Sequence, residues 1–409
     1  MSALRTGPAG PNATKSPQPH SVYLHVPFCA VRCAYCDFNT YAGLEALMPE
    51  YVSALCREVE LVGASAPEKL LVHTVFLGGG TPSLLPVSAV KKILDAVNTA
   101  FELLPDCELT LEANPGTVDF EQLAGLRAAG INRISFGVQS ANAHELQLLD
   151  RLHTFAQAQT AVHNARRAGF ARLSLDVMFG LPYQTLPEWQ HTLHAVLALN
   201  PDHLSVYALI LEHGTPMQAA VTKGQLPLPD SDLAADMYEW ASATLTQNGW
   251  VQYEISNWAR PPTAPHSPTQ ECRHNLQYWR NLPYLGFGAG AHGFAGGARY
   301  SNALAPQAFI KRMRAARPSA FPASPACVQR TEVSAAVEMS DTMLMGMRLT
   351  HEGVSARNFE SRFGTSLEAQ FGAKLRALQA RGLVDWTGER ARITPGGRLL
   401  ANMVFTEFI

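Results

Sequence analysis

The chain is organised around residues 22–36, Val-Tyr-Leu-His-Val-Pro-Phe-Cys-Ala-Val-Arg-Cys-Ala-Tyr-Cys, where a short apolar run leads directly into three closely spaced cysteines. The apolar run is typical of a buried strand. A four-iron cluster takes four ligands, so three thiolates leave one iron open to a substrate or cofactor, as an open position marks a catalytic zinc site. Structural zinc needs four protein ligands, and no second Cys or His pair follows at a fitting distance. Since the odd number of thiols also argues against a disulfide, the spacing predicts a metal cluster held by Cys29, Cys33 and Cys36.

Composition and charge describe a folded protein without a strong electrostatic field. The 409 residues are 47% hydrophobic and 16% charged, which is typical of a globular chain with a large α/β domain and a smaller one. The net charge of -2 gives no field that would attract nucleic acid or an anionic membrane. No stretch is apolar enough to span a bilayer, although peripheral membrane contact stays open, and the N-terminus lacks the apolar segment of a secretory signal. Because the cysteines outside residues 29–36 are scattered, we expect a reducing, cytoplasmic environment.

Short β-rich segments alternate with helix-period segments from residue 21 to about 215. We expect strands at 22–26, 73–77, 108–112, 133–137, 172–178 and 203–209. We expect helices near 48–62, 86–101, 119–129, 154–168 and 187–198. Six βα units in series predict an α/β fold with a parallel sheet, either open or curled into a partial barrel.

Each expected strand is followed at once by glycine or polar residues. The first strand runs into the cysteines, and the others end at Gly78-Gly-Gly-Thr-Pro82, Glu112-Ala-Asn-Pro115, Gly137-Val-Gln-Ser140, Asp176 with Gly180-Leu-Pro182, and Glu212-His-Gly-Thr215. Because ligands gather at the carboxyl ends of parallel strands, these segments predict one ligand site. An unpaired carboxylate is costly inside an apolar strand, so Glu112 and Asp176 indicate a ligand or a cationic partner there.

The sequence pattern divides the chain into four parts. We expect a disordered lead-in at 1–20, a barrel with its extension at 21–300, an Ala/Pro/Ser-rich linker at 301–330 and a separate helical domain at 331–409. The last part predicts three helices and two short strands, which is a winged-helix shape. From residue 326 to the end there are 10 Lys/Arg and 9 Asp/Glu, whereas a DNA-reading wing is distinctly basic. We therefore expect a protein-binding or lid domain and no nucleic-acid partner.

Gly78-Gly-Gly-Thr-Pro82 is a bare backbone loop that lets main-chain groups approach a ligand closely. It matches neither of the phosphate-binding glycine patterns. Together with Cys29-x-x-x-Cys33-x-x-Cys36, it resembles the radical S-adenosylmethionine (SAM) superfamily. The resemblance implies a partial (β/α)6 barrel of radical SAM type, here followed by the winged-helix-like domain. It also implies that the three cysteines hold a [4Fe-4S] cluster whose open iron chelates the amino and carboxylate groups of SAM.

Further motifs are similar to those of the oxygen-independent coproporphyrinogen III oxidase family and, within it, of its heme chaperone branch. They cover nearly the whole chain from residue 21 on, and they are Tyr23-x-His25-x-Pro27-Phe-Cys29, Leu111-Glu-Ala-Asn-Pro115, Gly137-Val-Gln-Ser140, Arg151, Asp176-Val-Met-Phe-Gly-Leu-Pro182 and His274-Asn-Leu-Gln-Tyr-Trp279. The resemblance implies a SAM pocket lined by Tyr23, Gly79, Gly80, Thr81, Glu112, Gln139, Arg151 and Asp176. Acidic and amide groups suit a zwitterionic ligand that carries a ribose.

Two departures place the chain in the heme chaperone branch. Phe38 stands where the oxidase branch has one more cysteine, and only a short segment precedes the first strand, where the oxidase has a longer arm. This branch implies binding of heme and its delivery to apo-hemoproteins such as respiratory enzymes. His274 is the favoured heme ligand, with Cys272 and His292 as alternatives, because imidazole is a common axial ligand and flanking aromatic rings can pack on a porphyrin.

Two other functions compete with the chaperone. The runner-up is a radical SAM oxidase of coproporphyrinogen III, which a decarboxylated product in an anaerobic assay would reveal. A simple electron-transfer iron–sulfur protein is the third, but such a protein has no use for an open iron or for the glycine loop.

Overall fold

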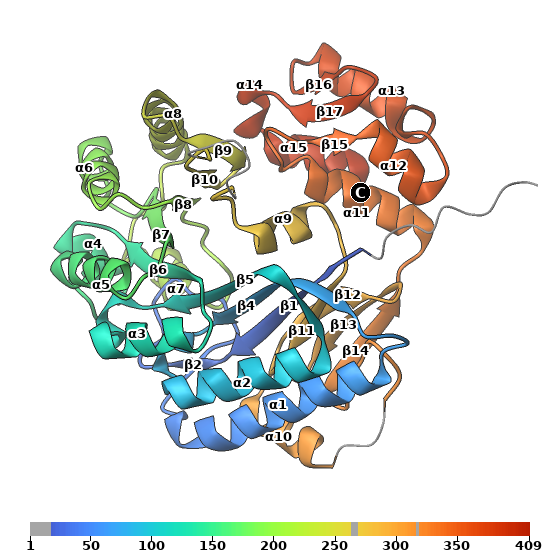
Figure 1. Ribbon diagram of the computed structural model, residues 1–409. Coiled ribbons are helices and arrows are strands. Elements are labelled where there is room, and N and C mark those ends of the chain that lie inside the picture. Colours follow the sequence, from blue (N-terminus) through green and yellow to red (C-terminus); the bar gives the residue numbers. More distant parts are fainter. Residues whose placement is uncertain (1–17, 263–268, 316–318) are drawn as a thin grey trace, which may run out of the picture.

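The computed structural model describes residues 18–262, 269–315 and 319–409 (Figure 1). Among these residues the main sheet has 12 strands, in the order β14-β13-β12-β11-β1-β4-β5-β6-β7-β8-β10-β9. Six neighbouring strands are parallel and follow chain order, namely β1 (His20–Val26), β4 (Leu71–Gly79), β5 (Glu102–Ala113), β6 (Arg133–Gln139), β7 (Arg172–Phe179) and β8 (His203–Ala208). The predicted partial (β/α)6 barrel is confirmed, and each of its strands lies where the sequence predicts it.

Helices connect these strands and cover the outer side of the curved sheet (Figure 1). The five that the sequence predicts are α1 (Met48–Ser65), α2 (Val87–Ala100), α3 (Phe120–Ala128), α5 (Phe155–Arg167) and α6 (Leu186–Leu197). Three more are α4 (Ala143–Leu148), α7 (Pro216–Thr222) and α8 (Ser231–Gln247). Local capping explains two of the starts, because Thr154 and Thr185 each form a capping box with the residue three positions on.

Side chains alternate between the two faces of the strands, and this alternation makes the inner face polar. On β1, Val22 and Leu24 are fully buried in the core that the helices share. Ser21, the residue before Val22, points to the opposite face. Its side-chain oxygen makes a hydrogen bond with that of Thr74 on β4, and the two oxygens are 2.5 Å apart. Because successive strand residues face opposite sides, the inside of the barrel collects polar groups from strand after strand.

The sheet continues past the barrel at both edges. Beyond β8 lie the antiparallel strands β10 (Asn257–Ala259) and β9 (Val251–Glu254). Beyond β1 lie β11 (Tyr284–Phe287), which is parallel to β1, and then β12 (His292–Ala295), β13 (Ala298–Asn302) and β14 (Cys327–Glu332). Two short strands, β2 (Phe28–Cys29) and β3 (Tyr41–Ala42), pair beside the end of β1.

The prediction of a linker at 301–330 is wrong for the described residues of that segment. It contains helix α10 (Pro306–Arg314) and the beginning of β14. Phe309, Ile310 and Met313 of α10 are buried in the main core, where the rings of Phe309 and Tyr51 lie 5.1 Å apart. Only a few apolar side chains anchor this helix, so the overall composition of the segment, which is rich in Ala, Pro and Ser, does not indicate it.

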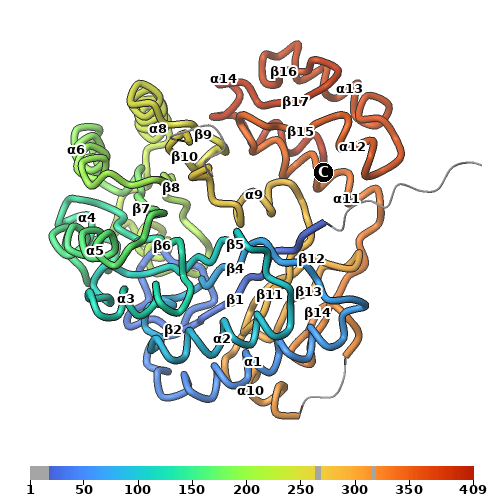
Figure 2. Tube along the Cα trace, viewed as in Figure 1, coloured from blue at the N-terminus to red at the C-terminus, as the bar shows by residue number. Residues whose placement is uncertain are grey.

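The C-terminal domain has its own hydrophobic core, around Phe359, Phe371 and Leu375. Its helices are α11 (Ala335–Gly346), α12 (Ala356–Phe363), α13 (Leu367–Ala380), α14 (Pro395–Arg398) and α15 (Ala401–Phe405). Its sheet has the order β15 (Val354–Ser355), β17 (Arg390–Ile393) and β16 (Val384–Trp386). Three helices, with β15 between the first two, and the β16–β17 hairpin after them match the predicted winged-helix-like shape. Figure 2 shows this domain beside α9 (Arg273–Trp279), which lies at the inner side of the barrel.

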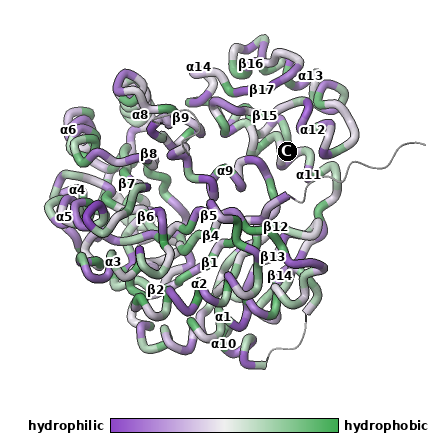
Figure 3. The backbone as a smooth tube through the Cα atoms, in the orientation of Figure 1, coloured by the Kyte–Doolittle hydropathy of each residue, from purple (hydrophilic) through white to green (hydrophobic). Residues whose placement is uncertain are grey.

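Two expectations concern the ends and surfaces of the chain. Most of the predicted lead-in at 1–20 lies outside the described residues, and His20 already belongs to β1. No helix in the described ranges combines the length and the apolar character needed to cross a membrane. Consistent with this, hydrophilic and hydrophobic segments alternate along the helices in Figure 3.

Candidate functional site

The cysteine loop leaves the carboxyl end of β1 and opens onto a cavity of about 160 Å³. Cys29, Cys33 and Cys36 all line this cavity. Cys29 is buried while the other two are half-buried, and a turn between the Cys36 amide and the Cys33 carbonyl, 3.2 Å apart, brings the last two together. Burial raises the pKa of the Cys29 and Cys36 thiols. Their thiolate forms therefore need a nearby cation, which a metal cluster supplies.

The glycine loop at the end of β4 packs against this cysteine loop without room for side chains. Gly79 has φ +112°, and a Cβ there would lie 2.5 Å from Cε1 of His25. A Cβ on Gly80 would lie 2.6 Å from the Phe28 carbonyl oxygen and 3.1 Å from Cys29 Sγ. The Thr81 hydroxyl donates to Cys29 Sγ at 3.6 Å. Glycine is therefore required at Gly79 and Gly80 for the close approach of the glycine loop to the cysteine loop.

Two carboxylates from neighbouring parts of the sheet face the same cavity. Glu112 Oε2 accepts from the Gly79 amide at 3.2 Å, and the Ser135 hydroxyl donates to both Asp176 carboxyl oxygens, at 3.1 and 3.2 Å. Burial, with a further contribution from Asp176, raises the pKa of Glu112 to about 7. Burial also raises the pKa of Asp176, although the hydroxyls of Ser205 and Ser135 oppose this rise. Two carboxyl groups that are costly to ionise together favour a cationic ligand between them.

Arg151 connects the cluster loop to β6. Its Nη1 donates to Cys33 Sγ at 3.5 Å and its Nη2 donates to the Gly137 carbonyl at 2.6 Å. Its Nε is buried and has no hydrogen-bond partner among the described residues. Gln139, which also lines the cavity, ends β6 at a φ of +66°, a conformation that L residues rarely adopt. An unpaired buried N–H beside a strained residue indicates a place that an anionic group of a ligand can fill.

The structure brings together ten of the residues that the sequence assigns to the cluster and the SAM pocket, and it leaves out one. The ten that line the cavity are Cys29, Cys33, Cys36, Gly79, Gly80, Thr81, Glu112, Gln139, Arg151 and Asp176. Tyr23 does not line it. The Tyr23 hydroxyl instead lies 2.9 Å from Nδ1 of His25, and His25 packs beneath Gly79. Tyr23 therefore supports the residue under the glycine loop, one layer below the cavity.

Several lining residues were missed by reasoning from the sequence. Tyr35, Thr40 and Ser135 all face the cavity. Tyr35 lies between two of the cysteines, and burial raises its pKa above the ordinary range for tyrosine. Ser135 precedes Gly137 by two positions on β6, so strand alternation was a signal that could have found it.

His274 does not line this cavity; it lies inside the barrel and is enclosed by its neighbours. It is 1% exposed, its Nδ1 lies 2.8 Å from the Thr74 hydroxyl and its Nε2 lies 2.9 Å from the Tyr278 hydroxyl. Its ring stacks on Phe76 at 5.0 Å, and burial lowers its pKa to about 3. The assignment of His274 as the heme ligand stays a prediction; in this structure both of its ring nitrogens have hydrogen-bond partners, so heme ligation would require one of these hydrogen bonds to break.

The two alternative heme ligands also differ in their surroundings. Cys272 is 1% exposed, and its thiol donates to Glu108 Oε1 at 3.7 Å. Glu108 is itself fully buried, pairs with Arg172 at 2.8 Å and accepts from the His274 amide at 3.2 Å. This carboxylate therefore holds the start of α9 inside the barrel. His292, in contrast, is exposed at the start of β12.

Comparison with known proteins agrees with this fold and this cavity. Residues 23–196 match the model of the radical SAM superfamily, and residues 333–400 match the model of the HemN C-terminal domain. The solved structure of coproporphyrinogen III oxidase (HemN) from Escherichia coli, a radical SAM enzyme, superimposes with a TM-score of 0.80 at 23% identity, covering 97% of this chain and 91% of that one. The architecture and the cysteine-lined cavity are those of a radical SAM protein.

Closer relatives narrow this class. The chain is 37% identical over 390 residues to the heme chaperone HemW of Bacillus subtilis, covering 95% of this chain and 99% of that protein. It is 38% identical over 392 residues to the heme chaperone HemW of Mycobacterium tuberculosis, covering 95% and 94%. The chain belongs to the HemW family.

The radical SAM class implies a [4Fe-4S] cluster and SAM, and the residues present fit both. Three thiols line one cavity, and no further Cys or His lines it among the described residues, as expected for a cluster with an open iron. SAM carries a carboxylate and positive charges. The unpaired Nε of Arg151 suits the carboxylate, and the carboxyl groups of Glu112 and Asp176 suit the positive charges. The bare glycine backbone lets the ligand approach closely.

Proposed function

We propose that this protein is a heme chaperone that holds a [4Fe-4S] cluster and SAM in the cysteine-lined cavity and delivers heme to apo-hemoproteins such as respiratory enzymes. The observation that carries the proposal is the full-length similarity to two proteins named heme chaperone HemW. The seven free cysteines support a reducing compartment, and we place the protein in the cytoplasm.

In this proposal Cys29, Cys33 and Cys36 hold the cluster, and the cavity residues hold SAM. Arg151 offers its free Nε–H to the carboxylate of the ligand, and Glu112 offers a carboxylate to its amino group. Gly79 and Gly80 let the backbone close on the ligand without a clash. When bound, the cluster supplies an iron that can coordinate SAM. Phe38, which is 60% exposed on the rim of the cavity, adds an apolar group there instead of a further thiolate.

Heme titration of the anaerobically reconstituted protein, followed in the Soret band, tests binding. Saturable binding and subsequent transfer to a purified apo-hemoprotein are the expected results. A protein that carries its cluster but shows no saturable heme binding, or that releases no heme to the acceptor, would contradict the chaperone function.

The complete cavity also favours one enzymatic alternative, the radical SAM oxidation of coproporphyrinogen III. Glycine loop, carboxylates and guanidinium are all in place, as such chemistry requires. An anaerobic reaction with reductant, SAM and coproporphyrinogen III separates the two functions. Decarboxylated product would establish the oxidase, whereas unchanged substrate together with heme transfer supports the chaperone.

A further inference from the structure

A group of metal-ligating side chains lies outside the SAM cavity, where helix α4 contacts helix α6. It consists of His144 and Glu145 on α4 and Glu188 on α6. One ring nitrogen of the histidine and one carboxylate oxygen of each glutamate all lie within 4.8 Å of one another. Helix α4 belongs to the segment between Gln139 and Arg151, two residues that line the SAM cavity.

Glu145 is the buried member of this group, with only 1% of its surface exposed. The Ser140 hydroxyl donates to Oε2 of Glu145. The other carboxylate oxygen, Oε1, is buried and has no hydrogen-bond partner among the residues that the structure describes. A buried carboxylate oxygen is costly unless a donor or a cation satisfies it. The unpaired oxygen of Glu145 therefore indicates a ligand of positive charge at this group.

Buried hydrogen bonds fix the start of α4 against α6. Nδ2 of Asn142 donates to the Glu188 carbonyl oxygen at 3.1 Å and to the Thr192 hydroxyl at 3.2 Å. The Thr192 hydroxyl in turn lies 3.3 Å from that of Ser140, and both of these residues are fully buried. Because Ser140 also holds the carboxyl group of Glu145, the buried ligand candidate has a fixed position beside α6.

The other two side chains already have the spacing of two zinc ligands. Oε2 of Glu188 accepts from the Thr185 amide at 2.8 Å and from its hydroxyl at 2.7 Å, whereas Oε1 lies 3.2 Å from Nε2 of His144. Zinc bonds of about 2.1 Å in tetrahedral geometry place neighbouring ligand atoms about 3.4 Å apart. The His144 side chain is 62% exposed and that of Glu188 is 32% exposed, so both can turn towards the fixed Glu145 carboxylate.

The ligand types favour zinc over the other common divalent ions. Imidazole nitrogen suits Zn²⁺, whereas Mg²⁺ and Ca²⁺ take six or more oxygen ligands, which this group does not offer. Two neighbouring carboxylates repel each other, and the charge of one divalent ion cancels both of theirs. Three protein ligands leave the fourth tetrahedral position to water.

We propose that His144, Glu145 and Glu188 form a zinc site that fastens α4 to α6. The ion satisfies the unpaired oxygen of Glu145 and links it to two ligands at the protein surface. It thereby holds the helix of the segment that carries Gln139 and Arg151 into the SAM cavity. The role of the ion is structural, and the proposal does not depend on the heme chaperone function.

The test is equilibrium dialysis of full-length, tag-free protein against zinc. The protein carries its cluster, so that the three cluster cysteines do not compete for the added metal. The wild type should bind zinc with nitrogen and oxygen ligands at about 2.0–2.1 Å and without sulfur at about 2.3 Å, as measured by X-ray absorption at the zinc edge. His144→Ala should weaken this binding at least about tenfold. Glu145→Gln should do the same, although it keeps an oxygen for the Ser140 hydroxyl.

Thermal unfolding gives a second measurement, because an ion that binds only the folded protein stabilises it. Free zinc at about 100 times its dissociation constant should raise the Tm of the 409-residue wild type by about 3 °C. His144→Ala changes an exposed side chain and should keep the fold, but it should lack this rise. Mg²⁺ should raise the Tm of neither protein.

Matched controls separate the site from other zinc-binding groups. His163→Ala on α5 and Glu121→Gln on α3 change exposed residues outside the group, and both variants should bind zinc as the wild type does. Equal zinc affinities of the wild type, His144→Ala and Glu145→Gln would overturn the proposal. So would ligation through sulfur, an equal rise in Tm with Mg²⁺, or no binding at a free zinc concentration of about 10 μM.

Discussion

The buried carboxyl of Glu112 gives the most quantitative prediction. Its pKa rises from an ordinary value of 4.5 to about 7, because burial and the neighbouring Asp176 carboxyl disfavour its charge. The folded protein therefore binds this proton more tightly than the unfolded chain does. Below pH 4.5 this difference costs no folding stability. The loss of stability grows between pH 4.5 and about 7, and above that pH it is constant. At about 1.4 kcal/mol for each tenfold change in proton affinity, the full cost is about 3 kcal/mol.

Replacing this carboxyl by an amide removes the cost and keeps an oxygen for the Gly79 amide. Without cluster or SAM, the Glu112→Gln protein should be about 3 kcal/mol more stable than the wild type at pH 8 and equally stable at pH 4.5. With an unfolding entropy of about 2.1 cal/mol/K per residue, the gain corresponds to a rise of about 4 °C in Tm for 409 residues. Thermal unfolding between pH 4.5 and 9 measures this difference.

Saturating SAM should reverse the order of the two proteins, because the ionised Glu112 then pairs with the amino group of the ligand. Glu121→Gln, a change of an exposed carboxyl on α3, is the matched control and should alter neither Tm nor its pH dependence. A stability gain that is absent at pH 8, or that persists undiminished at pH 4.5, would refute the reasoning about the buried charge.

Three further predictions concern the cluster, the SAM pocket and the barrel interior. Cys33→Ala should lose the iron and the broad visible absorption of a [4Fe-4S] cluster, since two thiolates are too few to hold it. Gly79→Ala should weaken SAM binding at least about a hundredfold in calorimetry, because its Cβ would lie 2.5 Å from the His25 ring and its φ is +112°. Glu108→Ala should lower the free energy of unfolding by about 3 kcal/mol in denaturant titrations, because Arg172 would lose its carboxylate partner and the amides of Arg273 and His274 would lose their buried acceptor.

Each of these changes has a counterpart that should be mild. Cys56→Ala, at a thiol buried against α2, should keep the full iron content. Gly396→Ala adds a Cβ with nothing within 4 Å and should leave SAM affinity unchanged. Asp106→Ala removes the ion pair with Arg273. Because the Asp106 side chain is 75% exposed, the change should lower the free energy of unfolding by less than about 1 kcal/mol. Equal effects within any of these pairs would contradict the corresponding prediction.

The barrel and its cavity could be predicted from the sequence because their signals are local. Strand and helix periods mark each βα unit, and a parallel sheet places every strand end at the same edge. The cysteines, Glu112 and Asp176 therefore meet although they are far apart in the chain. The prediction of a linker at 301–330 failed because buried side chains of Phe309, Ile310 and Met313 fix the position of α10, and the average composition of the segment does not show them.

The surroundings of Tyr23 and His274 depend on contacts that no local pattern encodes. Tyr23 has the right strand face but lies below His25, which fills the space under Gly79. His274 is closed off by Thr74, 200 residues away along the chain, and by Tyr278 on its own helix.

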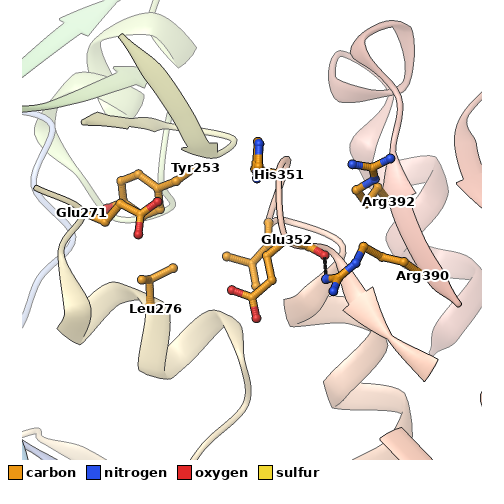
Figure 4. Close-up of a pocket in the computed structure, with 8 residues that line it drawn as sticks. Tyr253, Glu271, Leu276, His351, Glu352, Arg390 and Arg392 are labelled. Carbon is orange, nitrogen blue, oxygen red and sulfur yellow. Dashed lines mark hydrogen bonds between the residues drawn. The ribbon is translucent and has the colours of Figure 1, made fainter. Parts of the chain in front are cut away.

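Helix α9 lies between strand β4 of the barrel and a cavity beside the C-terminal domain (Figure 4). One of its faces carries His274, which contacts Thr74 and Phe76 of β4, and that strand continues into the glycine loop of the SAM pocket. Its other face carries Leu276, which lines the cavity at the C-terminal domain. A shift of α9 would therefore disturb both its contacts with β4 and the cavity that Leu276 lines. By thermodynamic linkage, any factor by which SAM changes the affinity for a ligand in the cavity beside the C-terminal domain is the factor by which that ligand changes the affinity for SAM.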